Sequence, residues 1–330
     1  MKNLNDVALL RVYAVLTLVA WHSYCSYICW GIADTPMSPV YTIFFHFFTP
    51  DANMPLFTFI SGYLFYYLLK EKKHYNRFKT FLSNKTHRLL IPFLILGSLT
   101  NILSYNKNII DLFYGKPNHL WYCLMLFYCF IICYIIETRF NSKINKLLMC
   151  LSFIGAFIMQ FIKTGGPLTI NSPLGIFLPM YYYHYFYSGF LVYKYKEKII
   201  LNIKKYWWII TILYIISCLY TRYLLPIAAY SYILLLLTLA NSSFFIKKME
   251  ISQFSNIIFQ IGKYSFGIYV FHQWIIWNIT RVPSILSQIQ PLMIKYDIFF
   301  PLVLFIFIFI LSFLLTKISV KTKIGKYLLT

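Results

Sequence analysis

The chain has 330 residues, of which 60% are hydrophobic and only 12% carry a charged side chain. Soluble domains average about 25% charged residues, so this composition excludes a soluble globular protein. The formal net charge of +21 would suit a nucleic-acid-binding protein. The basic residues stand between hydrophobic runs rather than on one solvated face, which argues against that class. We interpret them as topology signals and as contacts with anionic membrane lipids.

Hydrophobic runs recur along the whole chain, each long enough for a hydrocarbon core about 30 Å thick. They predict an all-α, polytopic integral membrane protein of about ten transmembrane helices, forming a single domain with no soluble domain. The predicted spans are 8–30, 41–69, 88–105, 118–137, 146–163, 174–193, 206–222, 226–245, 262–280 and 298–316.

The second predicted span is too long for one straight helix and contains two prolines, Pro50 and Pro55. A proline inside a helix removes a backbone hydrogen bond and clashes with the preceding turn, so we expect a break here. The stretch 41–49 is therefore predicted as a short flanking helix, and the true span as the helix after Met54.

The distribution of lysine and arginine predicts the orientation. With both termini in the cytoplasm, the inner segments hold Lys2 and the basic clusters of 70–88, 139–146, 194–205, 247–263 and 317–326. The outer segments hold only Lys107, Lys116, Lys163, Arg222, Arg281 and Lys295. This bias follows the positive-inside rule and predicts a protein of the cytoplasmic (inner) membrane with both termini inside.

The seven cysteines lie mostly inside apolar runs and form no CxxC pair. Neither a disulfide framework nor a zinc site is predicted from that spacing. Cys25 and Cys29 come close to His22 in sequence, but we expect these thiols to pack as small hydrophobic side chains rather than to bind a metal. No metal and no permanently bound cofactor is expected.

Arg11 and His22 are the notable polar residues of the first span. They are eleven residues apart, which is three helical turns plus about 20°, so both project from one face, about 17 Å apart along the axis. An ionisable residue inside a membrane span indicates a functional site. The alternative is structural: Arg11 would extend to the headgroups, and His22 would hydrogen-bond a neighbouring helix.

Several motifs resemble, in order, those of the membrane-bound acyltransferase-3 family, which includes O-acetyltransferases of bacterial envelope and capsular glycans. They are Arg11 and His22 with ten residues between them, MPLFTFISGYLF at 54–65, NKTHRLLIPF at 84–93, NHLWYCL at 118–124 and GKYSFGIYVFHQ at 262–273. The resemblance covers nearly the whole chain. It implies transfer of an acyl group from cytoplasmic acyl-CoA to a hydroxyl of an extracytoplasmic or lipid-linked glycan.

The resemblance also implies roles for individual residues. His22 would be the general base that takes the proton of the attacking hydroxyl, and Arg11 would help to orient it or to bind the donor. Arg11, Lys85 and Arg88 would hold the phosphates of CoA. Where the family often has Arg-x-x-Arg, this chain has Lys85 in the first position, which keeps the charge but loses the bidentate fork. Alternatively, Lys85 and Arg88 only belong to a basic inner loop.

Four further residues are candidates for the substrate site: Ser61, Trp121, Tyr269 and His272. Each has a structural alternative, namely helix packing for Ser61, an interfacial aromatic anchor for Trp121, and an interhelical hydrogen bond for Tyr269 and His272. Tyr269 and His272 are three residues apart on one helix face. The predicted orientation puts His272 at a depth comparable to that of His22.

Three classes of function remain open at this point. An O-acyltransferase with acetyl-CoA as donor and a surface polysaccharide or lipid-linked oligosaccharide as acceptor fits the motifs best. A transporter or glycan flippase would also explain many spans and buried ionisable groups. A non-catalytic partner of an export system is the third. The ionisable residues concentrate in the first, third and ninth spans, where the motifs lie, and this favours the enzyme.

Overall fold

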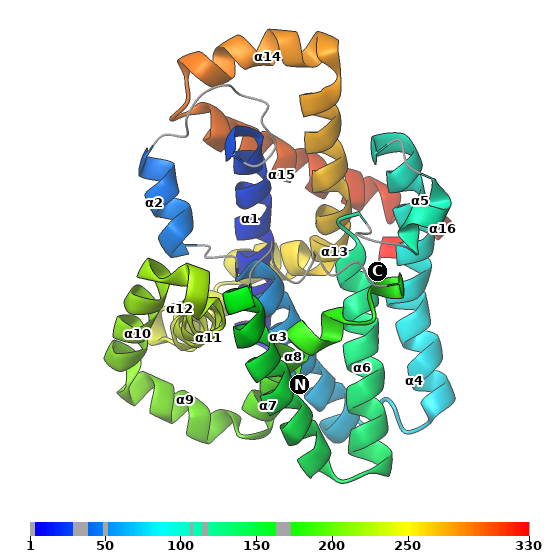
Figure 1. Ribbon diagram of the computed structural model, residues 1–330, viewed down its shortest axis with the longest axis vertical. Coiled ribbons are helices and arrows are strands. Elements are labelled where there is room, and N and C mark those ends of the chain that lie inside the picture. The colour runs from blue at the N-terminus through cyan, green and yellow to red at the C-terminus, as the bar shows by residue number, and fades with distance from the viewer. Residues whose placement is uncertain are drawn as a thin grey trace.

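Helix α1 (Asn5–Ile28) stands in the middle of the molecule, with the other long helices arranged around it (Figure 1). The computed structural model describes residues 4–28, 39–48, 52–105, 108–113, 118–162 and 173–329. These ranges are helical with short connections and hold no strand, so the all-α prediction is confirmed.

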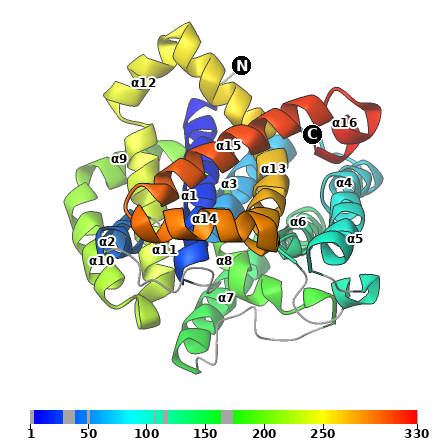
Figure 2. The same cartoon turned by 90° about the horizontal axis from the view of Figure 1, so that it is seen from above.

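The remaining elements follow in chain order. They are α2 (Pro39–Phe48), α3 (Asn53–Tyr66), η1 (Tyr67–Glu71), α4 (Phe78–Lys85), η2 (Thr86–Leu90), α5 (Ile91–Tyr105), η3 (Ile109–Leu112), α6 (Trp121–Arg139), α7 (Ser142–Ile162), η5 (Pro173–Gly175), α8 (Leu178–Lys194), α9 (Lys196–Lys205), α10 (Trp207–Leu219), α11 (Thr221–Ala240), α12 (Ser243–Glu250), α13 (Ser252–Arg281), α14 (Pro283–Lys295), α15 (Phe300–Ser319) and α16 (Lys323–Leu329). Seen from above, α9 to α12 lie on one side of α1, and α4, α5 and α16 lie on the other (Figure 2).

A described helix lies in each of the ten predicted spans. Among the described residues, six helices are long and apolar enough to cross a membrane, and the bent pair α9 and α10 brings the number to seven. The other three predicted spans hold α3, α8 and α13. Length and composition thus support six or seven crossings, and ten stays a prediction.

The break in the second predicted span is confirmed, because α2 ends at Phe48 and α3 begins at Asn53. The helix that contains the third predicted span starts earlier than that span. The helix begins at Phe78 instead of residue 88 and continues through α4, η2 and α5 to Leu103. Its first turns contain charged residues typical of a loop, but one of them, Lys85, is buried inside the protein.

The first turn of α1 is tied to the bundle by a buried carboxylate. Asp6 lies 2.7 Å from the ammonium of Lys196 and accepts a 2.8 Å hydrogen bond from the hydroxyl of Tyr63. A negative charge in the first turn also interacts favourably with the helix dipole. These contacts join α1 to α3 and α9 and fix the helix that carries Arg11 and His22.

Helices α3 and α8 pack backbone against backbone, and this packing depends on two glycines. A Cβ atom on Gly62 would lie 1.8 Å from the carbonyl oxygen of Phe186, and one on Gly189 would lie 2.0 Å from that of Phe59. No side chain fits at either position, so the two backbones touch directly. Close helix packing, the structural alternative for Ser61, is thus provided by its neighbour Gly62.

Replacing Gly62 by alanine should lower the melting temperature of the detergent-purified protein, because the backbones of α3 and α8 must separate. Overpacking of this kind costs about 1–3 kcal/mol. Gly155→Ala is the matched control, since its added Cβ would meet its nearest neighbour at 3.8 Å, an ordinary contact. That variant should melt at the same temperature or higher, because alanine favours the helix. Equal melting temperatures for the two variants would contradict the packing described here.

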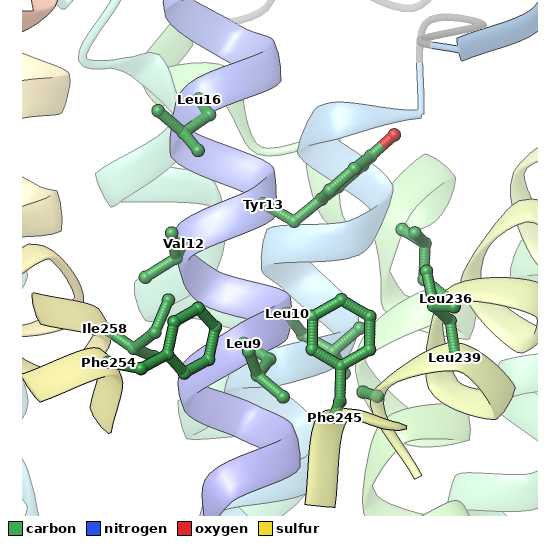
Figure 3. Close-up of a pocket in the computed structure, with 11 residues that line it drawn as sticks. Leu9, Leu10, Val12, Tyr13, Leu16, Leu236, Leu239, Phe245, Phe254 and Ile258 are labelled. Carbon is green, nitrogen blue, oxygen red and sulfur yellow. The ribbon is translucent and has the colours of Figure 1, made fainter. Parts of the chain in front are cut away.

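An apolar groove of about 150 Å³ runs along one face of α1 (Figure 3). Leu9, Val12 and Leu16 of α1 line it together with side chains from α11, α12 and α13. No ionisable group other than the phenol of Tyr13 is present, so this face offers apolar packing rather than chemistry. Arg11 lines a different cavity on another face of the same helix.

Candidate functional site

Arg11 and His22 both face α13. A Cβ atom on Gly262 of α13 would lie 3.9 Å from Cδ of Arg11. Eleven residues further along α1, Nδ1 of His22 lies 2.9 Å from Nε2 of His272. Residue numbers increase in the same direction on both helices from the first contact to the second, so α1 and α13 run parallel. The two histidines lie at the same level.

The hydrogen bonds of the two histidines determine where their protons lie. Nδ1 of His272 is 3.0 Å from the carbonyl oxygen of Ile268, and a carbonyl can only accept, so this nitrogen carries the proton. In the neutral ring, Nε2 of His272 must then be the acceptor, and Nδ1 of His22 the donor. Consequently the lone pair of the neutral His22 ring is on Nε2. His272 is completely buried, which keeps this arrangement away from solvent.

A cavity of about 280 Å³ lies on the same side of α1 and has an unusual charge pattern. Four of its lining residues are cations, Arg11, Lys85, Arg88 and Lys263, and none is an aspartate or glutamate. Clustered cations without carboxylates repel one another, so they favour an anionic ligand. Arg88 and Lys263 are exposed, whereas Tyr269, another lining residue, is buried. The cavity therefore leads from the protein surface into the bundle.

Lys85 is the most buried of these cations, with 7% of its surface exposed. Its ammonium nitrogen lies 3.4 Å from the ring centre of Phe130, 5.2 Å from that of Tyr75 and 5.7 Å from that of Phe65. Burial raises the pKa of the Tyr75 phenol, in the turn before α4, so this ring is a neutral π face and not an anion. Cation–π contacts offset only part of the cost of burying a charge.

The deep end of the cavity approaches the two histidines. The lining residues of α13 run from Gly262 to Tyr269, and His272 is one turn further, about 4.5 Å along the axis. The ring centres of Tyr269 and His272 are 6.0 Å apart. Ser61 also lines the cavity, and its hydroxyl donates to the carbonyl of Phe57 at 2.8 Å. The structure thus brings seven of the eight predicted site residues to one connected region.

Trp121 is the predicted site residue that lies apart. It is the first residue of α6, is not among the residues that line the cavity, and packs against Tyr182 with ring centres 5.4 Å apart. Its neighbour Tyr122 lines the cavity instead.

Sequence reasoning missed two residues of this region. One is Tyr122, and the other is His119, whose ring centre lies 5.6 Å from that of Tyr269 and 6.3 Å from that of His272. Both belong to the motif at 118–124, in which tryptophan was the obvious candidate. The sequence did offer a signal for both residues. The motif contains two ionisable rings, His119 and Tyr122, about one helical turn apart.

The residues of a possible metal site do not assemble in the described part of the chain. No three histidine, cysteine or acidic side chains come close enough there to hold an ion. Cys25 is buried, and Cys29 lies outside the described residues.

Comparison with known proteins identifies the family. The model of the acyltransferase domain of the acyltransferase-3 family matches residues 4–318. No curated protein and no solved structure matches the chain. The matched range includes both histidines and all four cations of the cavity, and it covers nearly the whole chain. The protein therefore belongs to the acyltransferase-3 family and is an integral membrane acyltransferase.

Proposed function

We propose that this enzyme moves an acetyl group from cytoplasmic acetyl-CoA to a hydroxyl of an extracytoplasmic or lipid-linked glycan, such as a capsular polysaccharide or exopolysaccharide, with His22 as general base. CoA is a substrate here and not a resident cofactor. A transporter or flippase gains no support from the family assignment, which concerns acyl transfer.

The cavity of four cations is the observation that carries this proposal. CoA brings several negatively charged phosphates, and Arg11, Lys85, Arg88 and Lys263 offer positive charge without a competing carboxylate in the lining. With the phosphates at the exposed end, the thioester can extend inward past Ser61 toward Tyr269. This direction leads to the histidine pair.

The reaction can be written with the side chains of this region alone. An acceptor hydroxyl gives its proton to Nε2 of His22 while its oxygen attacks the thioester carbonyl carbon. The tetrahedral intermediate then collapses, the C–S bond breaks, and the proton on His22 passes to the leaving sulfur. The products are an acetyl ester and free CoA.

His272 is proposed as a positioning residue for His22. By accepting from Nδ1 of His22, it holds the ring in the tautomer whose Nε2 is basic. It also stabilises the imidazolium that forms during attack, because the hydrogen bond strengthens when the donor is charged. Unlike a carboxylate in this position, the neutral imidazole adds no negative charge.

The charge distribution supports the two-sided geometry. If both termini are cytoplasmic, the cationic end of the cavity faces the compartment that supplies acetyl-CoA, as the positive-inside bias predicts. The histidine pair then lies deeper in the membrane, where an acceptor can reach it from the outer side.

Incubating the purified, folded protein with acetyl-CoA labelled in the acetyl group tests the proposal. We expect slow release of labelled acetate without an acceptor and transfer to glycan when membranes with candidate acceptors are added. Comparing surface glycan acetylation between a deletion strain and its parent identifies the acceptor. Folded protein that neither hydrolyses the donor nor transfers the label would refute acetyl-CoA as its donor.

A further inference from the structure

His119 is a buried polar residue that the reaction above leaves unused. It lies in the turn before α6, and neither of its ring nitrogens has a hydrogen-bond partner in the structure described. A backbone contact with Val270 of α13 reaches the ring, but its geometry is too poor for a hydrogen bond. Folded proteins rarely keep a buried polar group unpaired, because it costs free energy. Since a neutral imidazole always carries one N–H, the turn holds an available donor.

The turn that carries His119 is firmly fixed. The side-chain amide of Asn118 donates to the carbonyl of Gly97 at 2.7 Å and to the side chain of Asn101 at 2.8 Å, and its oxygen accepts from the amide of Leu120 at 3.0 Å. The hydroxyl of Tyr269 donates to the backbone carbonyl of His119 itself. The position of the ring is therefore set before any substrate binds.

The ring also lies next to the deep end of the donor cavity. Tyr122, one turn along α6, and Tyr269 both line that end. The ring of His119 contacts Tyr269 and lies edge-on to His272. A thioester that passes Tyr122 and Tyr269 on its way to His22 reaches His119 as well.

We propose that His119 is a catalytic residue that donates a ring N–H to the carbonyl oxygen of the thioester as this oxygen becomes negatively charged. The inference rests on the proposed function and deepens it. Attack on the carbonyl carbon moves an electron pair onto the oxygen, which returns to the carbon when the C–S bond breaks. His119 keeps its proton throughout. A fixed donor in a buried site stabilises such an oxyanion far better than water does.

Kinetics of His119 variants provide the first test. His119→Ala should lower kcat about 10²- to 10³-fold, the usual effect of losing one oxyanion donor, and change KM for acetyl-CoA less than about threefold. His119→Asn and His119→Gln place an amide N–H near Nδ1 and Nε2, respectively, and one of them should recover about tenfold or more. His184→Ala is the matched control. Nε2 of His184 is likewise buried and unpaired, but the ring contacts Phe153 and Tyr230, and none of these three residues lines the donor cavity. The His184→Ala variant should keep the kcat of the parent protein.

Vibrational spectroscopy of the bound donor is a second test that needs no turnover. In the His22→Gln protein, acetyl-CoA with a ¹³C carbonyl should show its stretching band at a lower frequency than in solution, because the N–H of His119 polarises it. Adding His119→Ala should shift the band back.

The outcomes separate the two proposals. Acetyl-CoA that binds and is transferred, with kcat and carbonyl band unaffected by His119→Ala, overturns the role of His119 alone. The role of His119 is also overturned if the His119→Ala, His119→Asn and His119→Gln variants lose activity only in proportion to their loss of folded protein. If no variant and no parent protein binds acetyl-CoA, both the proposed function and the role of His119 are wrong.

Discussion

His22→Gln should reduce acetyl transfer about 10²- to 10⁴-fold, the usual contribution of a general base, with little change in the affinity for acetyl-CoA. Glutamine keeps the approximate volume and polarity of the ring but cannot take a proton at neutral pH. Neither His22 nor His272 lines the donor cavity, so the donor should still bind. The measurements are kcat for labelled transfer and the dissociation constant of acetyl-CoA by calorimetry.

His272 variants show whether the pair works as a unit. His272→Leu removes the acceptor for Nδ1 of His22 and should lower kcat about tenfold to a hundredfold, as loss of a supporting group typically does. His272→Gln can place a carbonyl oxygen near the former Nε2 and should lose less.

If the His22→Gln protein is inserted correctly and transfers acetyl at the parent rate, His22 is not the base.

The register of α1 could be predicted from sequence because it depends only on helix geometry. Eleven residues at 100° bring Arg11 and His22 to one face, and the structure has both against α13. The break near Pro50 and Pro55 was predictable for the same reason, since proline acts locally.

Features that depend on neighbouring helices were not predictable. The start of the third helical stretch at Phe78 was missed because Lys79 and Lys85 suggest a solvated loop, while the fold covers Lys85 with aromatic rings from α3 and α6. His119 stands two residues before Trp121, for which the sequence suggested an interfacial anchor. Its nearness to His272 arises only from the packing of α6 against α13.

The central helices also explain why only some of the helices in the predicted spans qualify as membrane crossings by length and composition. Helix α8 contains six buried tyrosines, Tyr181, Tyr182, Tyr183, Tyr185, Tyr187 and Tyr193. Tyrosine lowers the mean hydropathy of a helix but suits a protein interior, where its hydroxyl finds a partner. A helix that is buried inside the bundle, such as α8, can thus be overlooked by a criterion suited to helices that face lipid.

Lys85→Met should change stability and donor affinity in opposite directions. Methionine keeps an unbranched apolar stem against Phe130 but removes an ammonium group that has no carboxylate in its cavity. Without the donor, relief of this buried charge should raise the melting temperature.

With the donor, Lys85→Met loses a charge-assisted hydrogen bond to phosphate worth about 1.5–3 kcal/mol, so KM for acetyl-CoA should rise about tenfold to a hundredfold, with a smaller effect on kcat. Lys79→Met is the matched control, because Lys79 is exposed on the same helix and does not line the cavity. It should keep both KM and melting temperature. Thermal melts with increasing acetyl-CoA measure both effects, since a ligand that binds the folded state stabilises it in proportion to its affinity. A Lys85→Met protein that melts lower than its parent without donor, yet keeps KM, would make Lys85 a structural residue. In that case the anion site would consist of Arg11, Arg88 and Lys263 alone.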